Sequence, residues 1–205
     1  MQIEVLHRYE SQLPAADRHP YRTGAWRPQT TERRAWDLDV EGTIPDDLNG
    51  VYLRNTENPL RPAIGFYHPF DGDGMLHSLS LAGGEATYHN RFVRTEGLDA
   101  EVDAGEALWA GFIEDPADAR REDGWGARGR MKDTSSTDVV VHGGEALTSF
   151  WQCGDLYRLD PVTLETLGRA TWDGRFPAEG VSAHTKVDEH TGDLLFFNYG
   201  TEAPY

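Results

Sequence analysis

The sequence contains very little cysteine and few basic residues relative to acidic ones, and each of these features excludes a class of protein. Cys153 is the only cysteine in 205 residues, so no disulfide forms within the chain and zinc sites built from several cysteines are excluded. A reducing compartment is therefore expected. Acidic residues number 35 against 19 Lys and Arg, of which only Lys132 and Lys186 are lysines. The net charge of −16 would repel nucleic-acid phosphates, so no nucleic-acid partner is expected.

Long apolar runs and the commonest catalytic motifs are also missing. No stretch approaches the roughly 18 apolar residues that span a bilayer, and the first 14 residues carry charges where a signal peptide is apolar. The sequence thus predicts a cytoplasmic protein. It contains no HExxH, GxSxG or Walker A motif. Residues 71–74 resemble the start of a calcium loop, but Ala82 occupies the position of the closing glutamate, so a tight turn is predicted.

Short runs of Val, Tyr, Phe and Leu alternate with turn residues and predict an all-β chain of antiparallel hairpins. The strong turn signals are residues 71–74 (DGDG), Gly83-Gly84, Gly143-Gly144, Asp160-Pro161 and Thr191-Gly192, and spacings of about 50 to 60 residues suit propeller blades. Residues 1–35 are polar and predict an N-terminal arm, whereas 36–205 form the first part of a single domain. The predicted strands are 36–40, 50–54, 75–81, 86–94, 137–141, 146–152, 155–159, 170–172, 182–188 and 193–199.

An acidic segment, residues 96–131, interrupts this pattern and is interpreted as an insertion between blades. Its stretch 104–113 is compatible with a helix. The apolar residues of that stretch would either pack on the propeller face, which is the simpler interpretation, or contact a membrane or cover a substrate tunnel; they are Leu108, Trp109, Phe112 and Ile113.

Eight histidines are present, and a lone histidine is usually structural. His77 alternates with Met75, Leu79 and Leu81 on one strand face and is therefore predicted to be a buried structural residue. Cys153 follows an apolar strand and is predicted to be a buried thiol, not a nucleophile.

Several strings resemble, in the correct order, motifs of the carotenoid cleavage oxygenases. They are residues 44–55 (IPDDLNGVYLRN), 70–77 (FDGDGMLH), 91–95 (RFVRT), 133–144 (DTSSTDVVVHGG), 159–168 (LDPVTLETLG) and 182–188 (SAHTKVD). The resemblance implies a seven-bladed β-propeller with a non-haem ferrous ion held by four histidines. His184 resembles the first of those ligands, and a neutral imidazole suits ferrous iron.

The chain departs from the family pattern at two positions near this motif. Thr185 replaces the usual proline after the histidine, and Gln152 replaces a glutamate that in many relatives orients another ligand. Glutamine accepts a hydrogen bond but adds no negative charge to the ligand set, so iron binding is expected to differ.

The resemblance implies an Fe(2+)-dependent dioxygenase that cleaves a conjugated C=C bond of a carotenoid or apocarotenoid to carbonyl products. It requires no catalytic side chain apart from metal ligands; its partners would be dioxygen and a hydrophobic polyene. The alternatives are a stilbene-cleaving dioxygenase or retinoid isomerase of the same fold, or a non-catalytic propeller module. These 205 residues suffice for about three blades plus the insertion, so the chain is interpreted as the N-terminal portion of a larger enzyme and is expected to be inactive alone.

Stilbene-cleaving relatives carry a tyrosine and a lysine that engage a phenolic hydroxyl group. Phe92 is placed at the tyrosine position, and Lys132 is interpreted as a surface charge. This placement predicts that long polyenes are cleaved better than hydroxystilbenes.

Overall fold

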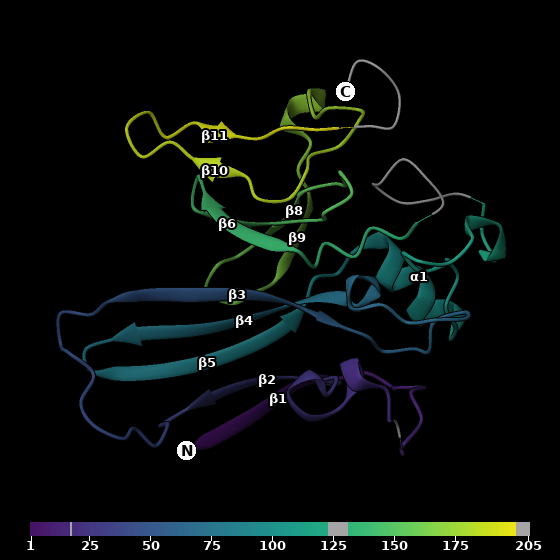
Figure 1. Cartoon of the computed structure of the whole chain (residues 1–205). Helices are drawn as coiled ribbons and strands as arrows, with labels where there is room; N and C mark the ends of the chain where they lie inside the picture. The colour runs from purple at the N-terminus through teal and green to yellow at the C-terminus, as the bar shows by residue number, and fades with distance from the viewer. Residues whose placement is uncertain (17, 123–130, 200–205) are drawn as a thin grey trace.

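The computed structural model describes residues 1–16, 18–122 and 131–199, and its regular structure is mostly antiparallel β-sheet (Figure 1). The first sheet has the order β1-β2-β5-β4-β3 and the second β6-β7-β8-β9, whereas β10 and β11 form a separate pair. The strands of the first sheet are β1 (Gln2–Arg8), β2 (Thr31–Trp36), β3 (Gly50–Asn58), β4 (Asp73–Ala82) and β5 (Glu85–Phe92). The others are β6 (Asp138–His142), β7 (Glu145–Ser149), β8 (Tyr157–Leu159), β9 (Thr166–Arg169), β10 (Lys186–Val187) and β11 (Leu194–Leu195).

Two diglycine turns set the registers of the central hairpins. Gly83 and Gly84 have φ values of 57° and 77°, and Gly143 and Gly144 have 59° and 85°. Both residues of each turn therefore adopt the left-handed conformation that glycine tolerates, as tight two-residue hairpin loops require. The turns connect β4 to β5 and β6 to β7, as predicted.

The one α-helix of the described residues, α1, spans Glu96–Ala104. The side chain of Thr95 caps its N-terminus by accepting a hydrogen bond from the Leu98 N–H at 3.0 Å, and Gly105 ends it with φ 73°. The expected helix at 104–113 is therefore wrong, because these caps place the helix one segment earlier. Short 3-10 turns occur at Pro20–Arg22, Gly24–Trp26, Pro69–Asp71, Pro116–Asp118 and Trp172–Gly174.

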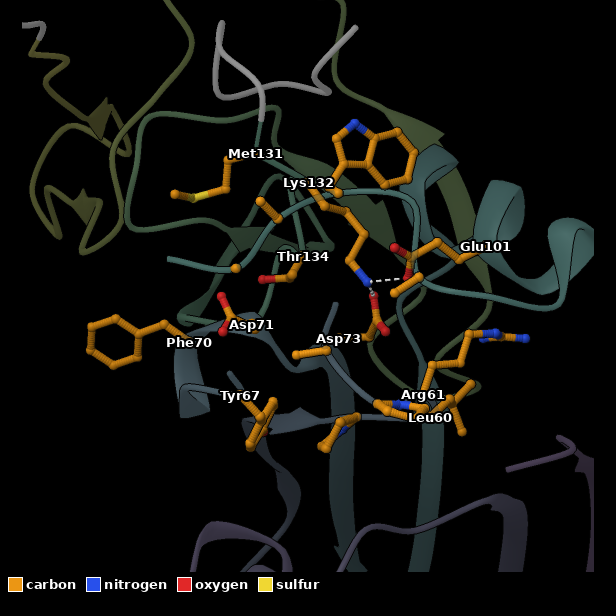
Figure 2. A pocket seen from close by; sticks show the side chains of 17 residues that line it. Leu60, Arg61, Tyr67, Phe70, Asp71, Asp73, Glu101, Met131, Lys132 and Thr134 are labelled. Atoms are coloured by element: carbon orange, nitrogen blue, oxygen red, sulfur yellow. Dashed lines mark hydrogen bonds and ion pairs between the residues drawn. The ribbon is translucent and has the colours of Figure 1, made fainter. Parts of the chain in front are cut away.

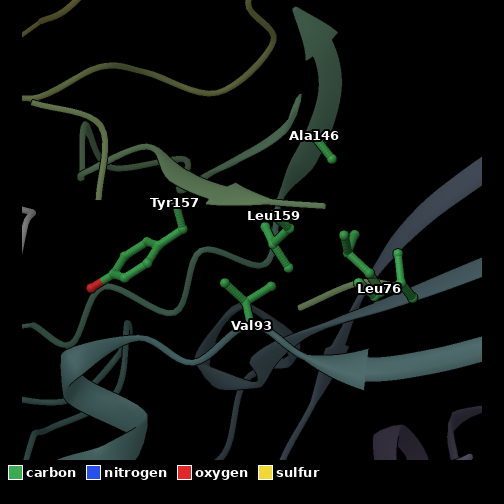
Figure 3. Close-up of a cluster of buried hydrophobic side chains, with 6 residues drawn as sticks. Leu76, Val93, Ala146, Tyr157 and Leu159 are labelled. Atoms are coloured by element: carbon green, nitrogen blue, oxygen red, sulfur yellow. The ribbon is translucent and has the colours of Figure 1, made fainter. Parts of the chain in front are cut away.

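The hydrophobic core lies between the first two sheets. Leu76 and Val93 pack against Ala146, Tyr157 and Leu159, all of which are buried (Figure 3). A second cluster lies on the other side of the first sheet and contains Tyr9, Leu60, Met75, Phe92 and Leu98. A third joins Leu147 and Leu156 to Ala170 and Val181. Face-to-face packing of consecutive antiparallel sheets is the arrangement of propeller blades.

Residues 133–136 form a buried connection between these two sheets. The Ser135 and Thr134 carbonyl groups accept hydrogen bonds from the Asn55 side chain (2.9 Å) and the Gly74 N–H (2.9 Å), respectively. A Cβ atom at Gly74 would lie 2.5 Å from the Ser135 oxygen, so only glycine allows this approach. This connection fixes the position of β6 relative to β3.

Most predicted strands are confirmed, although the described strands of the last sheet are shorter. Residues 37–40 and 170–172 are not strands, because β2 ends at Trp36 and the outer strand of the second sheet lies earlier, at Thr166–Arg169. The N-terminal residues contribute β1 and β2 to the first sheet. Among the residues that the structure describes, no helix is long and apolar enough to cross a membrane.

Candidate metal-ligand site

The arrangement of three strands determines the candidate site. β3, β6 and β10 each lie at one end of the strand order of their sheet, and β6 contacts both of the others (Figure 1). His184 lies two residues before β10, and Asp138 is the first residue of β6. The Nδ1 atom of His184 lies 3.1 Å from Oδ2 of Asp138. The side chains of two predicted motifs that are 46 residues apart thus meet between neighbouring sheets.

His184 has an unusual backbone conformation and an accessible ring. Its φ is 67°, in the left-handed region that residues other than glycine rarely adopt, and its side chain is 69% exposed. Because Nδ1 faces a carboxylate, this nitrogen donates the hydrogen bond, and in the neutral form of the ring the lone pair then lies on Nε2. A histidine ligand held by a carboxylate in this way suits a divalent metal ion such as ferrous iron.

The described residues do not form a complete metal site. Within 1–16, 18–122 and 131–199, no three His, Cys, Asp or Glu side chains are grouped closely enough to hold a metal ion. Among these residues, His184 and Asp138 meet as a pair. Its assignment as a ligand stays a prediction.

Of the histidine and cysteine predicted to be buried, Cys153 is buried, whereas His77 lines a hollow beside the first sheet. His77 is half-buried, with Nδ1 2.7 Å from the Tyr88 hydroxyl oxygen and Nε2 3.2 Å from Oγ1 of Thr56. Burial, together with the positive charge of Arg54, lowers the pKa of His77 and keeps it neutral. Cys153 is buried, and its Sγ accepts a hydrogen bond from the Tyr199 N–H.

Three partly exposed aromatic rings, Phe70, Phe112 and Trp151, form a cluster that we call the aromatic rim. The ring centroids of Phe112 and Trp151 lie 4.8 Å apart, and Phe70 is within 6 Å of both. The backbone N–H of Trp151 donates a hydrogen bond to Oγ1 of Thr137, the residue directly before Asp138. The backbone that carries the rim is therefore tied to the backbone that carries the partner of His184.

Asp71 holds the two halves of this rim together. Its carboxylate accepts hydrogen bonds from the backbone N–H groups of His68 (2.8 Å) and Phe112 (2.7 Å). Burial raises the pKa of Asp71, and the two hydrogen bonds oppose that rise. Residues 71–74, predicted to be a tight turn, instead end the 3-10 turn Pro69–Asp71 and begin β4 at Asp73, and Asp71 anchors the inserted segment next to Phe70.

The apolar residues of the inserted segment do not share one helical face, because no helix forms there. Trp109 is buried, whereas Phe112 and Ile113 are 38% and 53% exposed. Phe112 belongs to the aromatic rim, so this segment contributes both to packing and to the accessible aromatic surface.

A pocket beside the inserted segment contains the buried charge of Lys132 (Figure 2). Its Nζ lies 2.9 Å from an Asp73 oxygen and 2.7 Å from a Glu101 oxygen, and it points toward both carboxylates. Burial lowers the pKa of Lys132, but the two carboxylates outweigh this effect and the net pKa is raised. Lys132 is therefore charged, and the expectation of a surface charge is wrong.

Phe92 does not line the pocket that contains Lys132. It is 1% exposed in the second core cluster, and its ring meets the Tyr9 ring edge-on at 4.8 Å. The assignment of Phe92 to a phenol-binding position is therefore wrong, because this side chain is enclosed by its own core. Tyr67, in contrast, lines the pocket of Lys132, and burial raises its pKa.

Sequence reasoning did not identify Asp73, Glu101 or Asp138 as part of any site. Each of these carboxylates has its partner far away in the sequence, so no local pattern of residues predicts the contact. Gln152 lies in the turn after β7, and its side chain makes no hydrogen bond to the described residues. Its role near a metal stays a prediction.

Comparisons with known proteins agree with this architecture. The family model described as retinal pigment epithelial membrane protein matches residues 26–205. The isoeugenol monooxygenase of Pseudomonas nitroreducens is 35% identical over 178 residues, which is 87% of this chain and 36% of that protein. Carotenoid 9,10(9',10')-cleavage dioxygenase 1 of Phaseolus vulgaris is 33% identical over 98% of this chain and 38% of its own length.

A solved structure is similar as well. The crystal structure of Pseudomonas brassicacearum lignostilbene dioxygenase matches with a TM-score of 0.74 and 29% identity, over 89% of this chain and 37% of that protein. The sheets and this match define the chain as part of an oxygenase-type β-propeller. The chain belongs to the family of the retinal pigment epithelial membrane protein and the carotenoid cleavage oxygenases, and it spans little more than a third of the length of these relatives.

Proposed function

We propose that this chain is the first part of a non-haem iron(II) dioxygenase that cleaves a conjugated C=C bond to two carbonyl products. The observation that supports this proposal most strongly is the placement of His184. Its ring is accessible beside β6 and β10, and its Nδ1 is held by a carboxylate that leaves Nε2 as a metal-binding atom. Residues 1–35 would serve as an N-terminal arm whose strands extend the first blade.

Bound ferrous iron would supply the activation of dioxygen, and His184 would be one of its histidine ligands. The aromatic rim would give a conjugated substrate an apolar surface, since Phe70 and Phe112 expose their rings. Phe112 and Ile113 would also provide the residues for a peripheral membrane contact, through which an apolar substrate would enter.

The proposed first choice of substrate is a carotenoid or apocarotenoid. Two cations, Lys132 and Arg61, line this pocket, and three carboxylates, Asp71, Asp73 and Glu101, offset their charge, with Asp73 and Glu101 in direct contact with Lys132. A phenolate therefore meets no net positive charge there, and an uncharged polyene does not depend on one.

A stilbene or phenylpropene with a phenolic hydroxyl group is the second candidate. It is favoured by the presence of Tyr67 and Lys132 in one pocket, since the third Lys132 proton remains available as a donor. Assaying the full-length enzyme on an apocarotenal and on resveratrol side by side distinguishes the two. A strong preference for resveratrol would overturn the first choice.

The decisive experiment for the reaction class is His184→Ala in the full-length protein. We expect the loss of cleavage activity and a sharp fall in iron content, because a four-histidine set loses one neutral ligand. His190→Ala is the matched control, since His190 is an exposed histidine six residues further along. Full activity with about one iron per chain in His184→Ala would refute the assignment.

A further inference from the structure

Asp138 is held rigidly where the first two sheets meet. Its Oδ1 accepts a hydrogen bond from the Val139 N–H at 2.8 Å, and its carbonyl oxygen accepts one from the Asn55 side chain at 3.2 Å. The same Asn55 nitrogen also donates to the Ser135 carbonyl oxygen at 2.9 Å. The side chain and the backbone carbonyl group of Asp138 are therefore both held by contacts that do not involve His184. The fold itself thus determines the position of Oδ2.

This rigid carboxylate determines the state of the histidine ring. A carboxylate oxygen accepts hydrogen bonds, so the Nδ1 atom of His184, 3.1 Å from Oδ2, is the donor. In the neutral ring this tautomer has its lone pair on Nε2, and the same contact orients that atom. Among the described residues, Asp138 is the carboxylate in contact with His184, and the neutral Gln152 makes no such contact.

We propose that Asp138 is a positioning residue that fixes the tautomer and orientation of His184 for metal binding. The inference rests on the proposed function, in which His184 is an iron ligand. Asn55 supports it from β3, so residues of two inner strands together prepare the ligand that precedes β10. Partners of this kind typically change metal affinity 10- to 100-fold.

Asp138→Asn tests this role sharply because the amide cannot satisfy both of its contacts. If its oxygen accepts from Val139, its NH₂ group faces His184 Nδ1 and favours the tautomer with the proton on Nε2. If its oxygen faces His184, its NH₂ group opposes the Val139 N–H. Either way, one of the two contacts that define the ligand is lost.

The experiment measures Fe(II) affinity by chelator competition in the full-length protein for wild type, Asp138→Asn and Asp160→Asn. Asp160 is the matched control, since its carboxylate also accepts backbone N–H groups, from Val162 and Thr163, in an exposed turn. We expect Asp138→Asn to bind Fe(II) about 10- to 100-fold more weakly than either other protein. An affinity within twofold of wild type would overturn the proposal.

Two further measurements separate the possible failures. The ¹⁵N NMR shifts of the His184 ring in metal-free wild-type protein, assigned by comparison with His184→Ala, should report the proton on Nδ1, and a proton on Nε2 would overturn the proposal even if Asp138→Asn does not fold. If His184→Ala keeps its iron, the proposed ligand itself is wrong. If His184→Ala loses iron while Asp138→Asn retains wild-type affinity, only the role of Asp138 fails.

Discussion

Lys132 is a single ammonium group enclosed with two carboxylates, and its removal would leave Asp73 and Glu101 buried without their ion-pair partner. We expect Lys132→Met to lower the free energy of unfolding at pH 7 by about 3–5 kcal/mol. Burial already raises the pKa of Asp73, and loss of Lys132 would raise it further. The folded variant then binds more protons than the unfolded chain, so its stability increases as the pH falls.

Denaturant titrations of the full-length protein at pH 7 and pH 5 test this prediction. The difference between wild type and Lys132→Met should shrink at pH 5, where the carboxylates are more easily protonated. The triple variant Asp73→Asn/Glu101→Gln/Lys132→Met is the control, because it leaves no buried charge and should lose less stability. A difference below about 1 kcal/mol at pH 7 would contradict the buried ion pair.

Residue chemistry in the sequence predicted only part of these sites. The burial of Cys153 was predictable because it follows an apolar strand, whereas the ligand role that the motif implies for His184 stays a prediction. The burial of Lys132 was not predictable, because Asp73 and Glu101 lie in a strand and a helix whose packing brings them together. Asp138 was missed for the same reason, since its partner lies 46 residues later.

At the scale of elements, the contact of β4 with residues 134–135 requires glycine at position 74. A Cβ atom there would lie 2.5 Å from the Ser135 carbonyl oxygen, which belongs to the backbone and cannot rotate away. We expect Gly74→Ala to lower the free energy of unfolding by about 1–3 kcal/mol. Urea titration of the full-length protein measures this loss.

Gly143→Asn is the control for that substitution. Gly143 has φ 59°, a Cβ atom added there would meet nothing within 4 Å, and asparagine tolerates this conformation. The free energy of unfolding of the Gly143→Asn variant should stay within about 0.5 kcal/mol of the wild-type value. If Gly74→Ala and Gly143→Asn lowered the free energy of unfolding equally, the backbone of Ser135 would not limit the residue at position 74 to glycine.

The hairpins were predictable because diglycine turns and alternating residues act locally. The apolar content of 104–113 does not locate the helix, because the capping residues determine where α1 begins and ends. Thr95 followed by Gly105 marks the actual boundaries, and attention to that pair would have located α1. The shortness of β10 and β11 had no signal in the sequence, because their strand-like composition extends beyond the paired residues.

At the scale of the whole molecule, the isolated 205-residue chain leaves apolar surface uncovered. Tyr52 is 62% exposed on the face of the first sheet opposite Leu53, beside a hollow of about 560 Å³, and Leu195 is 55% exposed on β11. We expect the isolated chain to lack cleavage activity and to self-associate in size-exclusion chromatography with light scattering, where the full-length protein shows a single defined state.

Leu195→Lys should reduce that association, because a charge on the exposed strand opposes edge pairing. A monomeric isolated chain that melts cooperatively and cleaves a carotenoid would contradict both the uncovered surface and the incomplete propeller. The propeller as a whole was predictable through the order of its motifs. The strand pattern alone did not predict how the strands divide into blades, because β1 and β2 come from the polar N-terminal residues and still belong to the first sheet.

The enclosure of Cys153 also makes the chain convenient for site-directed labelling. Because this single thiol is buried, a maleimide reagent finds no accessible native target within the described residues. A cysteine introduced in the exposed turn between β8 and β9, for example at Val162, would therefore be the preferred attachment point for a spin label or fluorophore. Distances measured from such a probe would report how the second blade sits within the assembled ring.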